Sequence, residues 1–196
     1  MAPLEQTAAF VEGRTPAEEF ERLLREDEGV RAALEEAVAV PPYTNDGTAL
    51  DYLLRHGLSS VAARVNAVDL LSRFLSAKGM PHEPDRSASK LHTLMLEAQP
   101  SWLDVPTDYL EPLLRDTEGL ARRERRAALR TELLARFRCV KSPPRWMQSP
   151  EWPFVEGRPT LFVGQLDLGT LAHDEAQVYV FVDEATWAFR TVVQVA

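Results

Sequence analysis

Residues 143–159 read PPRWMQSPEWPFVEGRP, and this stretch separates two kinds of sequence. It holds five of the chain's 14 prolines, which excludes a regular helix or a central strand there. Residues 1–142 carry apolar side chains at helical spacing, whereas residues 160–196 carry runs rich in Val, Phe, Leu and Thr. The sequence therefore predicts a helical region at 1–142, a Pro/Trp-rich connector at 143–159 and an antiparallel β-meander at 160–196, together one compact unit.

About six helices are predicted before the connector. The most regular pattern runs from Val61 to Lys78, where apolar residues recur three or four positions apart behind a serine able to cap the helix. A helix is also expected to start at Thr15, because Thr15, Pro16 and Glu18 match a capping box with proline at the first helical position. A further helix is expected to follow Gly29. The helices would pack on the C-terminal sheet.

Three strand-like runs follow the connector, at 160–168, 177–183 and 189–195. Short connections between them favour an antiparallel meander. The predicted fold class is thus α+β, with a helical N-terminal part packed on a small C-terminal antiparallel β-sheet.

The middle run is apolar on both faces. Val178 and Val180 point one way, whereas Tyr179 and Phe181 point the other way, because side chains alternate along a strand. One face is expected to pack on the helices. The other has to be covered by more of this chain or by a partner, since large exposed apolar patches usually mark interfaces.

The C-terminal quarter also carries a combination of short patterns. Trp152-Pro153 is followed by Gly-Arg-Pro at 157–159, by an apolar run that ends in Gln-Leu-Asp-Leu at 165–168, and by Tyr-Val-Phe-Val-Asp at 179–183. In this order the patterns resemble the signature of the bacterial YwqG-like family, also called the domain of unknown function 1963. The resemblance covers about residues 146–196.

Members of that family commonly carry a longer β-rich domain. Here a mostly helical region precedes the signature, so the resemblance implies a truncated or fused variant. The family has no established reaction, and some similar proteins stand among bacterial toxin-immunity sets. The resemblance therefore implies that the protein belongs with bacterial toxin-immunity sets, but it implies no particular reaction.

Charge bears on the class of partner. The chain has 22 basic and 30 acidic residues, a net charge of -8, which argues against binding nucleic acid through its phosphates. The basic run at 122–126 includes Glu124 and reads as a solvated, partly paired helix face. A basic protein partner would be attracted instead.

Compartment follows from the first residues and the cysteine content. Residues 1–10 have neither the basic nor the apolar stretch of a secretory signal, and the single cysteine, Cys139, has no disulfide partner. The longest apolar run, Val178–Val182, is far shorter than the roughly 20 residues of a membrane-spanning helix. We therefore expect a cytoplasmic protein with no membrane partner.

No reaction is readable from the polar residues. The histidines and Cys139 lack the spacing of a zinc site, so no metal, cofactor or catalytic residue is predicted. His173, Asp174 and Glu175 form the one dense titratable cluster, which is either a polar hairpin loop or a site for metal or acid–base work. Cys139, with basic neighbours, is either a buried small side chain or a nucleophile of lowered pKa.

Several residues of the C-terminal quarter are expected to have structural roles. Trp146 and Trp152 are expected to fill the core, Gln165 to satisfy loop backbone, and Gly164 to mark a β-bulge or a close backbone approach. Two aspartates at strand ends, Asp167 and Asp183, are expected to form turns.

The function predicted from these observations is a noncatalytic protein-binding module, in particular an immunity-type protein that neutralises a basic bacterial toxin. The predicted partner-binding residues are the acidic run Glu26, Asp27 and Glu28 and the strand residues Tyr179 and Phe181. The alternative is an enzyme or small-ligand-binding protein that uses the His173 loop.

Overall fold

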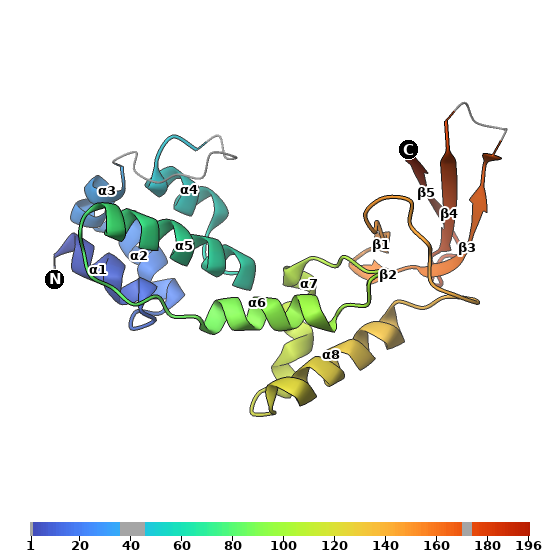
Figure 1. Ribbon diagram of the computed structural model, residues 1–196, viewed down its shortest axis with the longest axis horizontal. Helices are drawn as coiled ribbons and strands as arrows, with labels where there is room; N and C mark the ends of the chain where they lie inside the picture. The colour runs from blue at the N-terminus through green and yellow to red at the C-terminus, as the bar shows by residue number, and fades with distance from the viewer. Residues whose placement is uncertain (1, 36–45, 170–173) are drawn as a thin grey trace. The chain divides into compact units, whose positions relative to one another are not determined.

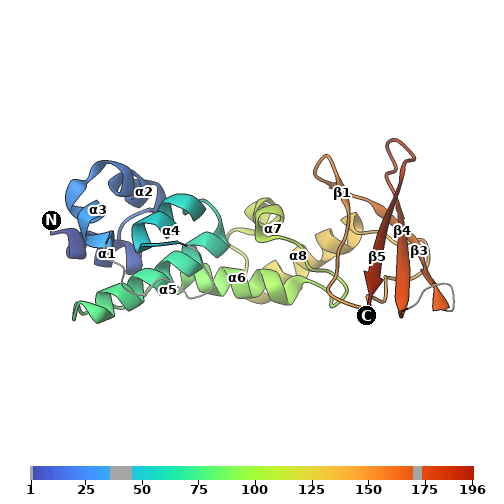
Figure 2. The same ribbon diagram turned by 90° about the horizontal axis from the view of Figure 1, so that it is seen from above.

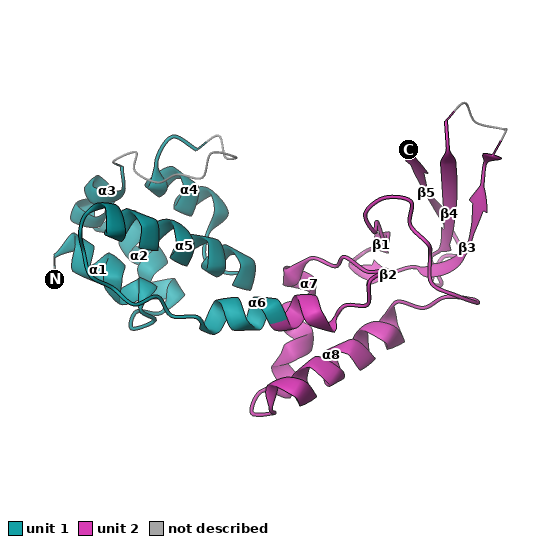
Figure 3. Ribbon diagram, in the orientation of Figure 1, with its two compact units in different colours: residues 1–93 teal, residues 94–196 magenta. Residues whose placement is uncertain are grey.

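The computed structural model of the chain describes residues 2–35, 46–169 and 174–196. They form two compact units, residues 1–93 and 94–196 (Figure 3). The boundary lies inside α6 (Ser87–Ala98), whereas the sequence analysis expected one unit with a change of character at residue 143. Each unit has helices, and the second also carries all the described strands, so the α+β class is confirmed (Figure 1).

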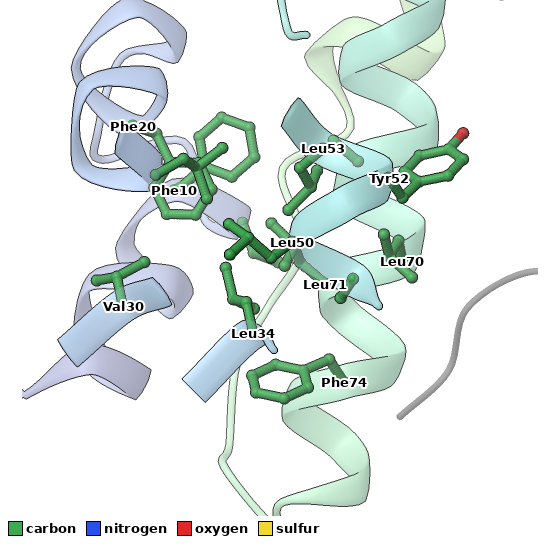
Figure 4. Close-up of a cluster of buried hydrophobic side chains, with 14 of the residues drawn as sticks. Phe10, Phe20, Val30, Leu34, Leu50, Tyr52, Leu53, Leu70, Leu71 and Phe74 are labelled. Atoms are coloured by element: carbon green, nitrogen blue, oxygen red, sulfur yellow. The ribbon is translucent and has the colours of Figure 1, made fainter. Parts of the chain in front are cut away.

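The described residues of unit 1 form five helices ahead of α6. These are α1 (Pro3–Val11), α2 (Ala17–Glu26), α3 (Glu28–Leu34), α4 (Ala49–His56) and α5 (Val61–Ala77). Their apolar stripes meet in one buried cluster (Figure 4), in which the rings of Phe10 and Phe20 stack with centroids 4.3 Å apart. Burial of such stripes, more than helix propensity, stabilises helices this short.

Two helix starts in unit 1 follow from their caps. The Ser60 hydroxyl accepts a hydrogen bond from the Ala63 amide at 3.1 Å at the start of α5, and the Thr48 hydroxyl does the same for the Asp51 amide at 3.0 Å in α4. At α2 the expected capping box is not formed. Pro16 stands at the N-cap position, where no side chain caps the helix.

Asp27, in the middle of the acidic run at 26–28, caps a helix. Its Oδ1 accepts a hydrogen bond from the Val30 amide at 2.9 Å, so Asp27 is the N-cap of α3 and Glu28 lies in the first turn of that helix. Negative charge is favourable at this end of a helix. Of the three acidic residues, only Glu26 lies at the end of a helix, and the role of all three in partner binding stays a prediction.

We expect Asp27→Ala to speed hydrogen exchange of the α3 amides at neutral pH, and Asp27→Asn, which still caps but lacks the charge, to give a rate between those of the parent and the alanine variant. The Val30 amide hydrogen bond lowers the pKa of Asp27. Stabilisation by the charge is therefore complete above the unfolded pKa of about 3.9 and is lost as pH falls through the lower folded pKa. Equal exchange in parent and alanine variant at pH 7 would contradict this.

Unit 2 begins with the end of α6 and continues with α7 (Thr107–Leu114), a 3-10 turn at Arg115–Thr117 and α8 (Arg122–Arg136). None of the described helices in either unit is long and apolar enough to cross a bilayer. The connector forms a small hairpin of β1 (Phe154–Val155) and β2 (Arg158–Pro159), which turns at Glu156 and Gly157 with φ of 49° and 75°.

The meander is confirmed. Strands β3 (Leu161–Asp167), β4 (Ala176–Val182) and β5 (Phe189–Val195) form an antiparallel sheet in the order β3-β4-β5. They lie side by side in both Figure 1 and Figure 2. The register shifts between Phe162 and Gly164, so a bulge occurs at the predicted place. The close backbone approach is not found, because a Cβ added to Gly164 would meet nothing within 4 Å.

The core of unit 2 is aromatic. Trp152 is only 7% exposed and lies 5.4 Å from Phe137, after α8, and 5.2 Å from Phe181 of β4, measured between ring centroids. Its indole N–H donates to the Thr160 carbonyl at 2.9 Å. On the far side Phe137 packs edge-on against Tyr109 of α7 at 5.8 Å. The last helices, the connector and the sheet thus share one core, which explains why they form a single unit.

Candidate functional site

One face of the three-stranded sheet, which we call the inner face, lies against the connector. It carries Phe162 of β3 and Tyr179 and Phe181 of β4, all at most 3% exposed. The centroid of the Trp146 ring lies 4.4 Å from that of Tyr179, with the two rings tilted by 38°. The placement of Tyr179 and Phe181 on a partner-binding surface is therefore corrected, because both side chains are enclosed by aromatic residues of the same unit.

Polar side chains of the inner face hold the connector by its backbone. The Tyr179 hydroxyl accepts from the Met147 amide at 2.7 Å and donates to the Arg145 carbonyl at 3.0 Å. Gln165 Oε1 accepts from the Arg145 amide at 2.7 Å, as the sequence analysis expected of this residue. These bonds satisfy connector groups that would otherwise be left unpaired.

Gln194 of β5 also forms hydrogen bonds with the connector backbone. It is 2% exposed, and its Oε1 accepts from the Met147 and Gln148 amides at 3.0 and 2.9 Å. Its Nε2 donates to the Ser149 carbonyl at 2.8 Å. The connector is thus bound to both β4 and β5, and the inner face is committed to the fold of unit 2.

The opposite, outer face of the sheet is apolar and open. The cross-strand row Leu166–Val178–Val193 runs over all three strands. Leu161–Val182–Phe189 forms a second row, in which Val182 is only 4% exposed, and Gly164–Val180–Thr191 lies between the two rows. Leu166 is 60% exposed, Val193 54% and Phe189 66%, and Val195 beside them is also exposed. Leu166, Val178 and Val193 are direct cross-strand neighbours, so their side chains form one apolar row across the sheet.

Acidic residues lie at the ends of the strands that carry this face. Asp174 and Glu175 precede β4 and are exposed, and Glu184, after β4, pairs with Arg138. Asp183 forms the expected turn, accepting from the Thr186 hydroxyl at 2.5 Å and the Ala185 amide at 3.2 Å. The Thr186 hydrogen bond, followed by the backbone bonds, lowers the pKa of the Asp183 carboxyl.

The polar cluster at 173–175 is described only in part. His173 lies outside the described residues, while Glu175 continues the sheet, its carbonyl accepting from the Ala196 amide at 2.9 Å. In the part of the chain that the structure describes, no three His, Cys, Asp or Glu side chains are grouped to hold a metal ion. The alternative that uses the His173 loop therefore stays a prediction.

Cys139 lies in a short parallel bridge to Phe162 and is partly buried. Burial raises the pKa of its thiol, so the hypothesis of a nucleophile with a lowered pKa is wrong. The basic neighbours do not activate it.

We expect Cys139 in the folded chain to react with iodoacetamide at pH 8 more slowly than in the urea-unfolded chain, because the thiolate is the reacting form and its fraction is smaller at a raised pKa. Mass spectrometry of timed samples gives both rates. Faster reaction of the folded chain would indicate an activated thiol.

The sequence analysis expected one sheet face to be covered and one to be left for a partner, but it chose the wrong one. The missed residues are Leu166, Phe189, Val193 and Val195. Their signal was the alternation of β5, where apolar side chains at 189, 193 and 195 share the face of Val178 and Val180.

Comparisons of the chain with models of protein families, with curated proteins and with solved structures found no match. The resemblance of residues 146–196 to the YwqG-like family therefore stays a prediction, and the functional argument rests on the geometry of the sheet.

Proposed function

We propose that this protein is a noncatalytic protein-binding module whose contact surface is the outer face of the β3-β4-β5 sheet. The observation that carries the proposal is the cross-strand row Leu166–Val178–Val193, in which Leu166 and Val193 are more than half exposed, with exposed Val195 next to Val193 on the same face. Monomeric proteins rarely leave such a patch in water, and aromatic and aliphatic anchors within a polar rim are typical of the centre of an interface.

The locked inner face supports the same proposal. A binding surface gains affinity when it is already ordered before the partner arrives, because less conformational entropy is lost on association. The hydrogen bonds from Tyr179, Gln165 and Gln194 to the connector fix the strands from behind. A partner would therefore bind an apolar surface that is already ordered.

The charge of the protein favours a basic partner. The net charge is -8, and exposed Asp174 and Glu175 lie at the end of the sheet. Complementary charge accelerates encounter, while apolar contacts set the lifetime of the complex. Together with the resemblance of residues 146–196, this leads us to propose an immunity-type protein that neutralises a basic bacterial toxin.

The test is a growth assay in which each protein encoded next to this gene is expressed alone, and any that arrests growth is then co-expressed with the parent chain or with the Leu166→Asp, Val193→Asp double variant. Restored growth with the parent, together with a stable complex of the two purified proteins, and failure of the double variant would agree with the proposal. Loss of viability with both chains, or equal protection by both, would contradict it.

A further inference from the structure

Unit 2 also contains a pocket that the protein-binding proposal does not use. It has a volume of about 320 Å³ and is lined by residues of the segment 141–145 and of β3: Lys141, Ser142, Pro143, Arg145, Phe162, Val163, Gly164 and Gln165. Ligand pockets in proteins begin at roughly this size. All of these residues are among those that the structure describes.

The pocket is built by pinning the segment 141–145 to β3 at both ends. Before the segment, the Val140 amide donates to the Phe162 carbonyl and the Phe162 amide to the Arg138 carbonyl, each at 2.9 Å. After it, the Arg145 amide donates to Gln165 Oε1 at 2.7 Å. The bulge of β3 falls between these two attachments. The segment 141–145 therefore crosses over the bulge of β3, and the pocket lies between the segment and the strand.

Arg145 is fixed more firmly than its exposed side chain suggests. Its carbonyl accepts from the Tyr179 hydroxyl at 3.0 Å, and Tyr179 is fully buried. Gln165 in turn donates from Nε2 to Gln177 Oε1 at 2.8 Å, so both ends of its amide are engaged within the protein. The guanidinium of Arg145 thus projects from an anchored backbone.

The charge of the pocket is the reverse of that of the chain. Its lining includes Lys141 and Arg145 and no carboxylate, in a protein of net charge -8. Neighbouring cations are paired, Arg138 with Glu184 and Arg136 with Glu132. Lys141 and Arg145 belong to none of the ion pairs found among the described residues. Two cations beside an open pocket provide a site for a negative charge.

The rest of the lining is apolar. Phe162 is buried beneath the pocket, and Val163 and Pro143 are exposed at its wall. An inorganic anion would use the two cations and leave these side chains in water, whereas an organic anion would use both. We propose that the pocket between the segment 141–145 and the bulge of β3 binds a small organic carboxylate with an apolar body, its carboxylate on Lys141 and Arg145 and its body on Val163 and Pro143.

The test follows the backbone amides of the ¹⁵N-labelled full chain by NMR during titration with phenylacetate, at one ionic strength. Its neutral analogue phenylacetamide and inorganic phosphate are titrated in parallel. Saturable shifts of the amides at 141–142, 145 and 162–165 with phenylacetate, with at least about tenfold weaker binding of both other probes, are expected.

The variant Lys141→Gln, Arg145→Gln is expected to weaken phenylacetate binding at least about tenfold, because charge-assisted hydrogen bonds are lost. The matched control is Arg123→Gln, Arg130→Gln on α8, with the same change of charge on exposed side chains, and it should bind like the parent. Thermal melting checks that both variants fold. No saturable shift, equal binding of phosphate or phenylacetamide, or equal weakening in the control would overturn the proposal.

Discussion

Replacing Trp152 by alanine is expected to destabilise unit 2 by about 3 to 5 kcal/mol, the usual cost of removing a buried large aromatic side chain. Trp152 is 7% exposed and lies among the rings of Phe137, Phe162 and Phe181. The substitution leaves a cavity among these rings and removes the donor to the Thr160 carbonyl. Both changes act on the junction of helices, connector and sheet.

The loss is measurable because all four tryptophans of the chain, at 102, 146, 152 and 187, belong to unit 2. Their fluorescence during urea unfolding therefore follows this unit alone. The matched control is Trp187→Ala, since Trp187 is 74% exposed in the turn after β4. A control change within about 0.5 kcal/mol is expected. A Trp152 variant as stable as the parent would show that the aromatic cluster is not the core.

The double substitution Leu166→Asp, Val193→Asp is expected to lower affinity for the protein partner at least about 100-fold, because two carboxylates would be desolvated at the centre of the interface. The two residues lie on either side of Val178 in one cross-strand row of the outer face. Both are more than half exposed, so the free chain should remain folded. Biosensor or calorimetric titration with the purified partner gives the affinity.

The control for this prediction uses Leu120→Asp and Leu134→Asp, two leucines of the same unit that are each 47% exposed. They undergo the same change of polarity and charge but lie outside the sheet. We expect affinity within about threefold of the parent. An equal loss in both double variants would point to charge in general rather than to the outer face.

The strands were largely predictable, because β-branched and aromatic runs bounded by turn residues leave few alternatives. The run expected at 189–195 is β5, and β3 and β4 differ from the expected ranges by one residue at each end. Which face of the sheet is buried was not predictable from the sequence. Both faces of β4 are apolar. Trp146 and Trp152 of the connector cover the face with Tyr179 and Phe181, and the sequence near β4 does not encode these contacts.

The division into units was missed for a related reason. Helical spacing says which residues form a stripe but not which surface the stripe covers. Tyr109 of α7 and Phe137 after α8 pack with Phe154 of the connector, so these helices belong with the sheet. Asp27 shows the same limit on a smaller scale. Its cap on the Val30 amide depends on the break between α2 and α3, which the sequence analysis placed after Gly29.

The most direct test of a binding function for the outer face is site-specific photo-crosslinking in the living cell. A benzophenone amino acid would replace Phe189 or Val193 on the outer face, and Glu28 or Leu120 at exposed positions outside the sheet. Our account predicts crosslinks from 189 and 193 to one basic protein, identified by mass spectrometry and shown to bind the parent chain when purified. Crosslinks to such a protein from 28 or 120 alone, or none from the two sheet positions, would contradict it.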